Sequence, residues 1–87
     1  MKIKAGYLLR EVAGHWVVIS LGEETLNFNG MMTLNASGRL LWQALEKEAD
    51  RESLAKVLTE RYDVSLEEAL ADVDAFVVKL KGYGCIQ

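Results

Sequence analysis

The sequence predicts an α+β domain in which a small antiparallel sheet comes first and a set of helices follows. The first third of the 87-residue chain is rich in β-branched and aromatic residues that are separated by turn signals. The remaining two thirds repeat apolar residues at helical spacing behind recognisable capping residues. A chain of this length has room for one domain, so residues 1–87 are treated as a single unit.

Three strands are expected in the first third of the chain. Residues 7–12 and 15–20 form the first two, and Ala13-Gly14 between them is a two-residue turn in which glycine tolerates a positive φ. These two strands should therefore pair as an antiparallel hairpin. An asparagine–glycine pair lies directly before residues 31–34, which fit a short third strand.

Three helices are expected in the rest of the chain. Asn35 is a suitable N-cap for a helix over residues 36–46, and Asp50 for one over residues 51–62. The third helix, over residues 66–81, follows a capping box in which a serine precedes a glutamate by three residues. Three helices beside a three-stranded sheet make a winged-helix-like arrangement with the strands first, and one edge of such a sheet can stay open.

Gly38 interrupts the first predicted helix. Glycine in a helix interior costs about 1 kcal/mol relative to alanine. We therefore expect the backbone at this position to pack closely against another element, such as a strand.

Composition and charge exclude several classes of function. The net charge of −3 and the pI of about 5.1 disfavour binding to a phosphate backbone, so we expect no nucleic-acid partner. The longest purely apolar run, residues 16–19, is far too short to span a membrane, and no signal-peptide pattern begins the chain. A single cysteine implies no internal disulfide. We expect a cytoplasmic protein without a membrane contact.

Candidate catalytic residues are sparse. His15 is the only histidine and Cys85 the only cysteine, which are too few ligands for a zinc site. Nothing in the sequence places the two near each other as a nucleophile and its base. We interpret His15 as a surface residue of the hairpin and Cys85 as a tail residue that packs on the domain. The clustered carboxylates fall in loops or at helix ends, where solvated acids are normal. We therefore predict a binding module, not an enzyme, with no cofactor and no metal.

One combination of residues is more specific than any catalytic motif. It comprises Leu34-Asn35 after the strands, Leu41-Trp42 seven residues on, Tyr62 at the end of the second helix, and an Asp72-Val73-x-x-Phe76-x-x-x-Leu80 run followed by Gly84. This pattern resembles the PqqD family over almost the whole chain. The resemblance implies a peptide recognition element, which holds the leader segment of a ribosomally made precursor peptide and presents the peptide to a modifying enzyme, often a radical S-adenosylmethionine enzyme.

In that family the leader adds as a strand to the edge of the third strand, in a groove beside the third helix. An open strand edge offers unpaired N–H and C=O groups for such pairing, and methionines suit variable peptide surfaces. The expected peptide-binding residues are those of the third strand, one aromatic residue before it and one side of the third helix: Phe28, Met31, Met32, Thr33, Leu34, Asp72, Phe76, Lys79 and Tyr83.

Two other functions fit the same elements. A winged-helix-like domain can bind DNA, although the acid-rich start of the third helix argues against it. The open strand edge can instead pair with a second copy of the chain and form a homodimer or an assembly module. The sequence leaves open whether the peptide belongs to a quinone cofactor pathway or to another modified peptide.

Overall fold

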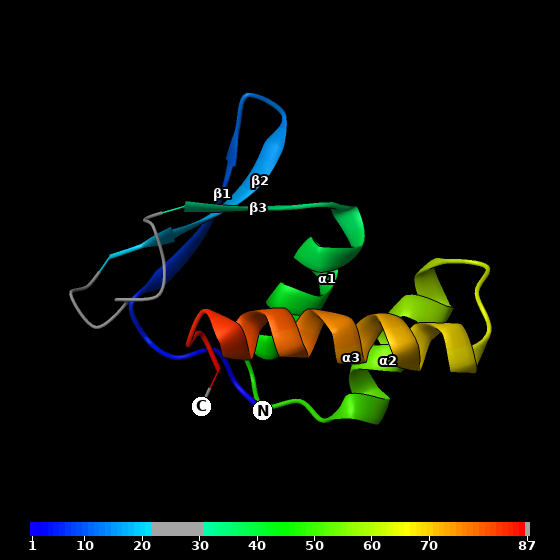
Figure 1. The fold of residues 1–87 in the computed structure, drawn as a ribbon. Helices are drawn as coiled ribbons and strands as arrows, with labels where there is room; N and C mark the ends of the chain where they lie inside the picture. The colour runs from blue at the N-terminus through cyan, green and yellow to red at the C-terminus, as the bar shows by residue number, and fades with distance from the viewer. Residues whose placement is uncertain (22–30, 87) are drawn as a thin grey trace.

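The computed structural model describes residues 1–21 and 31–86. The strands are β1 (Tyr7–Val12), β2 (His15–Ser20) and β3 (Met31–Leu34), and they have the bounds predicted from the sequence. They form one antiparallel sheet in the order β1-β2-β3, followed in the chain by three helices (Figure 1). The predicted α+β, winged-helix-like arrangement is confirmed.

The hairpin between β1 and β2 turns within two residues. Ala13 and Gly14 both have positive φ angles, of 51° and 82°. Positive φ at both central positions matches the right-handed twist of the strands. Because Ala13 has a Cβ atom, it adopts this conformation less readily than glycine or asparagine does.

The helices are α1 (Ala36–Leu45), α2 (Arg51–Arg61) and α3 (Leu66–Gly82). The first two end one residue before the predicted ends because Glu46 and Tyr62 are C-caps, outside the helical repeat. The third continues one residue beyond the predicted end.

Local side-chain bonds fix where the helices begin, as the sequence predicted. The Gly38 N–H donates to Oδ1 of the N-cap Asn35 at 2.8 Å. Asp50 and Ser65 cap the other two helices: each side chain accepts from the backbone N–H of the third helical residue, and the backbone N–H of each cap donates in turn to the side chain of that residue. These bonds satisfy backbone donors that a helix start leaves without partners.

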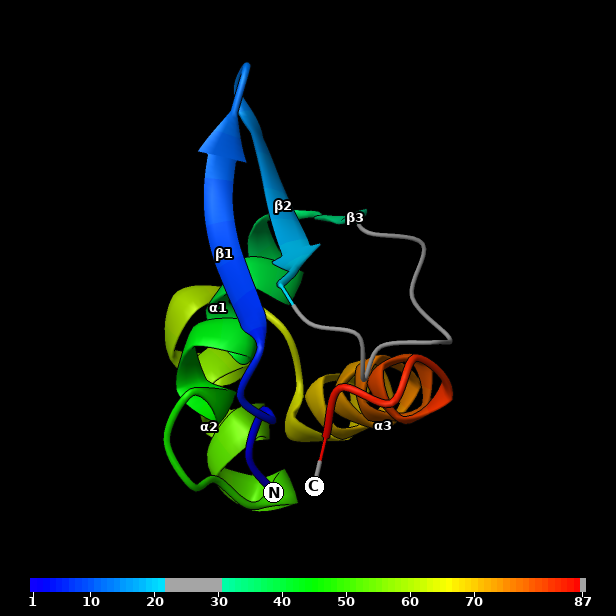
Figure 2. The ribbon, with the colours of Figure 1, turned by 90° about the vertical axis from the view of Figure 1, so that its left-hand side faces the viewer.

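The core lies between one face of the sheet and the three helices. Its largest fully buried side chains come from β2, from every helix and from the tail: Trp42, Leu45, Leu54, Leu80, Val18, Val73 and Cys85. The Tyr7 ring of β1 meets Trp42 edge-on, with ring centroids 6.1 Å apart. The tip of the hairpin extends away from the helices, whereas its base joins the core (Figure 2).

Residues 1–6, which the sequence analysis assigned to no element, tie the two ends of the domain together. The Ile3 N–H donates to the Leu45 carbonyl and the Lys4 N–H to the Cys85 carbonyl, both at 2.8 Å. Ile3 also forms an isolated bridge with Ile86, and the two termini lie near each other (Figure 2). Within the described ranges, no helix is long and apolar enough to cross a membrane.

Candidate functional site

The two outer strands of the sheet, β1 and β3, each have one edge with no strand partner among the described residues. Such an edge presents backbone N–H and C=O groups that can pair with another chain. β3 differs from β1 in that α1 follows it directly (Figure 1), and Leu34 at its end and Phe76 of α3 both lie close to Gly38 of α1. The edge of β3 is therefore the one that adjoins helical side chains.

Side chains of β3 alternate between the two faces of the sheet. Met32 and Leu34 are 6% and 5% exposed and belong to the core cluster, opposite Val18 and Trp16 of β2. Thr33 between them is exposed on the other face. These three predicted site residues therefore offer a ligand mainly their backbone, because two point into the core and one points away from the helices.

A groove with a volume of about 340 Å³ lies between the start of α1 and the middle of α3. We call it the α3 groove. Its lining residues come from the end of β3 and all three helices: Asn35, Ser37, Gly38, Leu41, Leu58, Asp72, Ala75, Phe76 and Lys79. Three of the predicted site residues, Asp72, Phe76 and Lys79, are thus brought together on one side of it.

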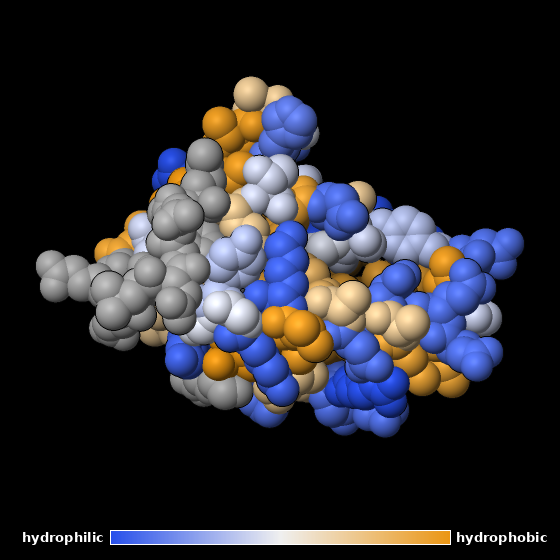
Figure 3. Space-filling model, viewed as in Figure 1, coloured by the Kyte–Doolittle hydropathy of each residue, from blue (hydrophilic) through white to orange (hydrophobic). Residues whose placement is uncertain are grey.

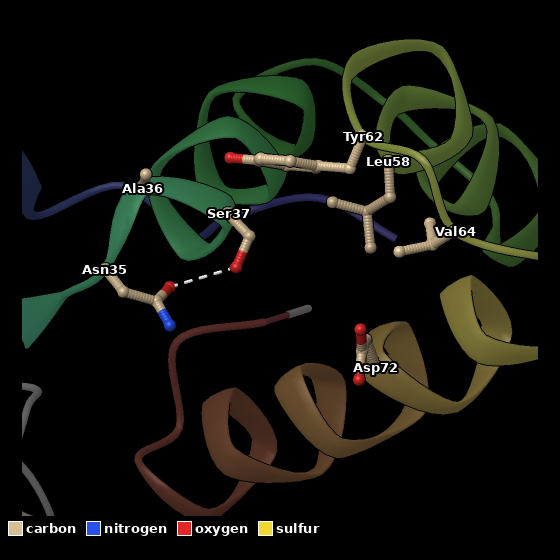
Figure 4. Close-up of a pocket in the computed structure, with 7 residues that line it drawn as sticks. All are labelled: Asn35, Ala36, Ser37, Leu58, Tyr62, Val64 and Asp72. Atoms are coloured by element: carbon tan, nitrogen blue, oxygen red, sulfur yellow. Dashed lines mark hydrogen bonds between the residues drawn. The ribbon is translucent and has the colours of Figure 1, made fainter.

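A second hollow, of about 350 Å³, continues from the α3 groove past Asp72. We call it the Tyr62 hollow, and it shares Asn35, Ser37, Leu58 and Asp72 with the groove. Figure 4 shows Asp72 from α3 facing the side chains of Ser37 and Leu58 across this space. The Ser37 hydroxyl donates to Asn35 Oδ1 at 3.1 Å, so the wall on the α1 side is held by the same cap that begins the helix.

Gly38 of α1 lies close to the end of β3 and to α3. A Cβ atom at this position would lie 3.0 Å from Asn35 Oδ1, 3.4 Å from Phe76 Cε1 and 3.5 Å from Leu34 Cβ. The tightest of these approaches is to the cap of α1 itself, whereas Leu34 of β3 and the Phe76 ring of α3 lie at ordinary van der Waals distance, so the strand contributes one contact of the packing that was expected. The absence of a side chain at Gly38 thus leaves room for Phe76 at the junction of β3 and the α3 groove.

The charged side chains of the groove have no ion-pair partners in the part of the chain that the structure describes. Asp72 and Lys79 are both exposed on α3, two helical turns apart. Polar and apolar side chains alternate along this face of α3, and the surface is hollowed between α3 and the start of α1 (Figure 3).

Most of the remaining exposed charges of α3 are acidic and lie near its start. Glu67, Glu68 and Asp74 are exposed with Asp72 in its first nine residues. Asp74 is bonded through both carboxylate oxygens to Arg51 of α2, at 2.7 and 2.8 Å. This Arg51 bond holds the pKa of Asp74 below its ordinary value. The start of α3 would therefore repel a phosphate backbone.

Of the other predicted site residues, Tyr83 does not line the groove. Tyr83 is half-buried, packs against the core cluster and is the C-cap of α3. Met31 begins β3 and pairs with Ile19. Phe28 lies outside the described residues.

The two residues considered for catalysis lie where the sequence analysis expected. His15 is exposed at the start of β2. Cys85 is fully buried, and burial raises the pKa of its thiol, while a hydrogen bond with Tyr7 and the charge of Lys4 act in the opposite direction. No group of three or more potential metal ligands occurs within residues 1–21 and 31–86.

The Tyr62 hollow was not predicted from the sequence; its lining includes Ser37, Leu58, Tyr62 and Val64. One signal for it was present: Tyr62 is part of the family-like pattern, yet it is 37% exposed and lies outside the core. A pattern residue that the core does not require is a candidate for a binding surface.

Fold and groove together define a small winged-helix-like domain with an open strand edge beside a helix. The model of the family described as coenzyme PQQ synthesis protein D (PqqD) matches residues 15–86, and the chain belongs to this family. No curated protein sequence matches the chain significantly.

Two solved structures share the fold over nearly their whole length. One is described as TbiB1 in complex with the TbiA(beta) leader peptide, with a TM-score of 0.80 and 20% identity over 100% of this chain and 95% of that chain. The other is described as lasso peptide synthetase B1 complexed with the leader peptide, with a TM-score of 0.76 and 23% identity over 97% of this chain and 93% of that chain. At 20% and 23% identity, these two similarities show a shared fold alone.

Proposed function

We propose that this chain binds the leader segment of a ribosomally made precursor peptide, which pairs as a fourth strand with the free edge of β3 beside α3. The observation that carries the proposal is the open edge of β3 next to the α3 groove, in a chain of the PqqD family. Both solved structures of the same fold are described as complexes with a leader peptide, which supports a leader peptide as the ligand of this chain.

Backbone pairing alone gives too little affinity for this role. In an antiparallel pair every second residue directs its N–H and C=O groups to one side, so the four residues Met31–Leu34 offer about four outward hydrogen-bonding groups. Each bond contributes about 0.5–1.5 kcal/mol net, or roughly 2–6 kcal/mol together. Micromolar affinity requires about 8 kcal/mol, and association itself has an entropic cost. Side chains of the leader must therefore bury apolar surface in the α3 groove.

The groove residues give the pairing its specificity in this proposal. Phe76 lies where β3 ends and presents an aromatic ring, and Leu58 extends the apolar lining into the Tyr62 hollow. Met32 and Leu34 keep the strand in place through the core, and Thr33 contributes only its backbone. Backbone hydrogen bonds thus supply affinity, and the pockets supply specificity for the side chains of the leader.

The proposal assigns no catalysis to this chain. Its role is to hold the leader so that the rest of the precursor reaches a modifying enzyme, as the PqqD family implies. We propose a radical S-adenosylmethionine enzyme as that partner. Modification of the full precursor should then fall when this chain is omitted, and should be restored when the chain is added back.

Fluorescence anisotropy with labelled leader segments encoded beside this gene tests the proposal. We expect a dissociation constant in the micromolar range or tighter, about −8 kcal/mol or stronger, for one leader and no binding of the core segment of the same precursor. Phe76→Leu should weaken binding about five- to tenfold because it removes the ring from the groove. Val78→Ala is the matched control, since Val78 is exposed on α3 outside the groove.

Binding of no leader, or equal binding by wild type and Phe76→Leu, contradicts the proposal. Pairing between two copies of the chain would use the same edge of β3. Light scattering with and without leader separates the two cases: leader binding leaves a monomer, whereas edge pairing gives a dimer that the leader dissociates.

A further inference from the structure

The α3 groove has a negative charge at one end and a positive charge at the other. Asp72 lies where the groove meets the Tyr62 hollow, and Lys79 lines the groove beyond Phe76. Seven residues of helix separate the two charges by about 10.5 Å along the axis of α3. Because neither is in an ion pair with another described residue, both are available to a ligand.

The direction of an added strand follows from the arrangement of β3 and α3. The two elements run in opposite senses across Figure 1. Both pairings in the sheet are antiparallel, and antiparallel pairing is slightly more stable per residue than parallel pairing. A strand added antiparallel to β3 therefore runs in the same direction as α3, from Asp72 towards Lys79.

The periodicity of a strand sets the spacing of the side chains that face α3. Residues i, i+2 and i+4 of an extended peptide share one face and span about 13 Å. That span exceeds the separation of Asp72 and Lys79 by about 3 Å, which the flexible side chains of both partners can take up. Residue i then meets Asp72, residue i+2 lies over Phe76, and residue i+4 meets Lys79.

Resting on the proposed function, we infer that the groove selects leader segments in which a basic, an apolar and an acidic residue occur in that order at alternate positions. The two charges of α3 fix the order, and hence the direction, of the bound strand. The Phe76 ring selects the apolar residue between them. Backbone hydrogen bonds to β3 do not depend on the order of the side chains. The charges of α3 therefore determine which order of residues the groove prefers.

Two short fluorescent peptides with identical composition test the inference. One has the central sequence KTLTE and the other ETLTK, with the same flanking residues. We expect the first to bind the wild-type chain about fivefold or more tightly than the second, since each exposed charge pair changes affinity severalfold. The preference should shrink as salt is raised, because these charges are exposed.

Exchanging the two charges of the groove provides the decisive variant. The double substitution Asp72→Lys, Lys79→Asp should reverse the preference at unchanged net charge. Lys56→Glu with Glu60→Lys is the matched control: it exchanges two exposed charges of α2 outside both hollows and should leave the preference as in wild type.

Equal affinity of both peptides, or a preference that the groove exchange does not reverse, overturns the inference and leaves the proposed function standing. A preference that the α2 exchange also reverses overturns it as well, because the effect then comes from the overall field. Failure of both peptides and of every leader to bind overturns the proposed function itself.

Discussion

Replacement of Asn35 by alanine removes the cap of α1 and part of the wall of both hollows. Oδ1 of Asn35 accepts from the Gly38 N–H at 2.8 Å and from the Ser37 hydroxyl at 3.1 Å. Loss of such a cap costs about 1 kcal/mol, within a range of about 0.5–2 kcal/mol. For a domain of this size, 1 kcal/mol lowers the midpoint of thermal unfolding by about 4–8 °C.

Urea denaturation followed by tryptophan fluorescence measures this effect, since Trp42 is buried and follows the cap by two turns. Asn35→Ala should lower the free energy of unfolding by about 1 kcal/mol with an unchanged slope against urea. Asn35→Asp is the control, because its carboxylate keeps the acceptor and suits the helix N-terminus. The reasoning is refuted when the alanine variant is as stable as wild type, or when the aspartate variant loses as much as the alanine variant.

Three further predictions follow from the fold. Arg51 lowers the pKa of Asp74, so this carboxylate stabilises the folded state above its unfolded pKa near 3.8, and the contribution disappears as the pH falls through the lower folded value. When the urea midpoint of unfolding is measured at decreasing pH, it should therefore fall less steeply at acid pH in Asp74→Asn than in wild type. The same fall in both proteins would count against the Arg51 bond. Ala13→Asn should raise the free energy of unfolding by about 0.5–1 kcal/mol, because asparagine accepts the positive φ of the hairpin turn; a thermal scan with an unchanged midpoint would contradict this. The buried Cys85 thiol, whose pKa is raised by burial, should react slowly with a disulfide reagent in the native state and quickly in urea, so rapid native labelling would show that the tail is not packed.

Much of the fold follows from local signals. The strands have their predicted bounds because turn residues flank them, and the helices begin where Asn35, Asp50 and Ser65 cap them. Two helices end one residue before the predicted position because Glu46 and Tyr62 are C-caps, and neither side chain marks a helix end in the sequence.

The features that were missed depend on contacts between distant parts of the chain. The backbone hydrogen bonds of Ile3 to Leu45 and of Lys4 to Cys85 join segments more than 40 and 80 residues apart. No local sequence pattern predicts such bonds. The Tyr62 hollow depends on how α1, α2 and α3 pack together. The alternation along β3 indicates two faces, but only the packed structure shows that Met32 and Leu34 face the core.

The candidate site was predicted in part for the same reason. Asp72, Phe76 and Lys79 share one side of α3 by helical periodicity, and the structure brings them into one groove. In the sequence, Gly38 stands out only because glycine is unfavourable inside a helix. Its packing against Phe76 and Leu34 shows that it serves the junction between β3 and the groove.

Amide exchange along β3, measured by NMR on the full chain with and without a bound leader segment, tests the central claim most directly. Strand addition predicts new protection at alternate residues of Met31–Leu34, together with shifts of the Phe76 ring resonances. Because β1 also has an open edge, its amides serve as the internal comparison and should not change. Protection at β1 instead of β3, or leader binding that leaves the amides of β3 unchanged, would contradict the account.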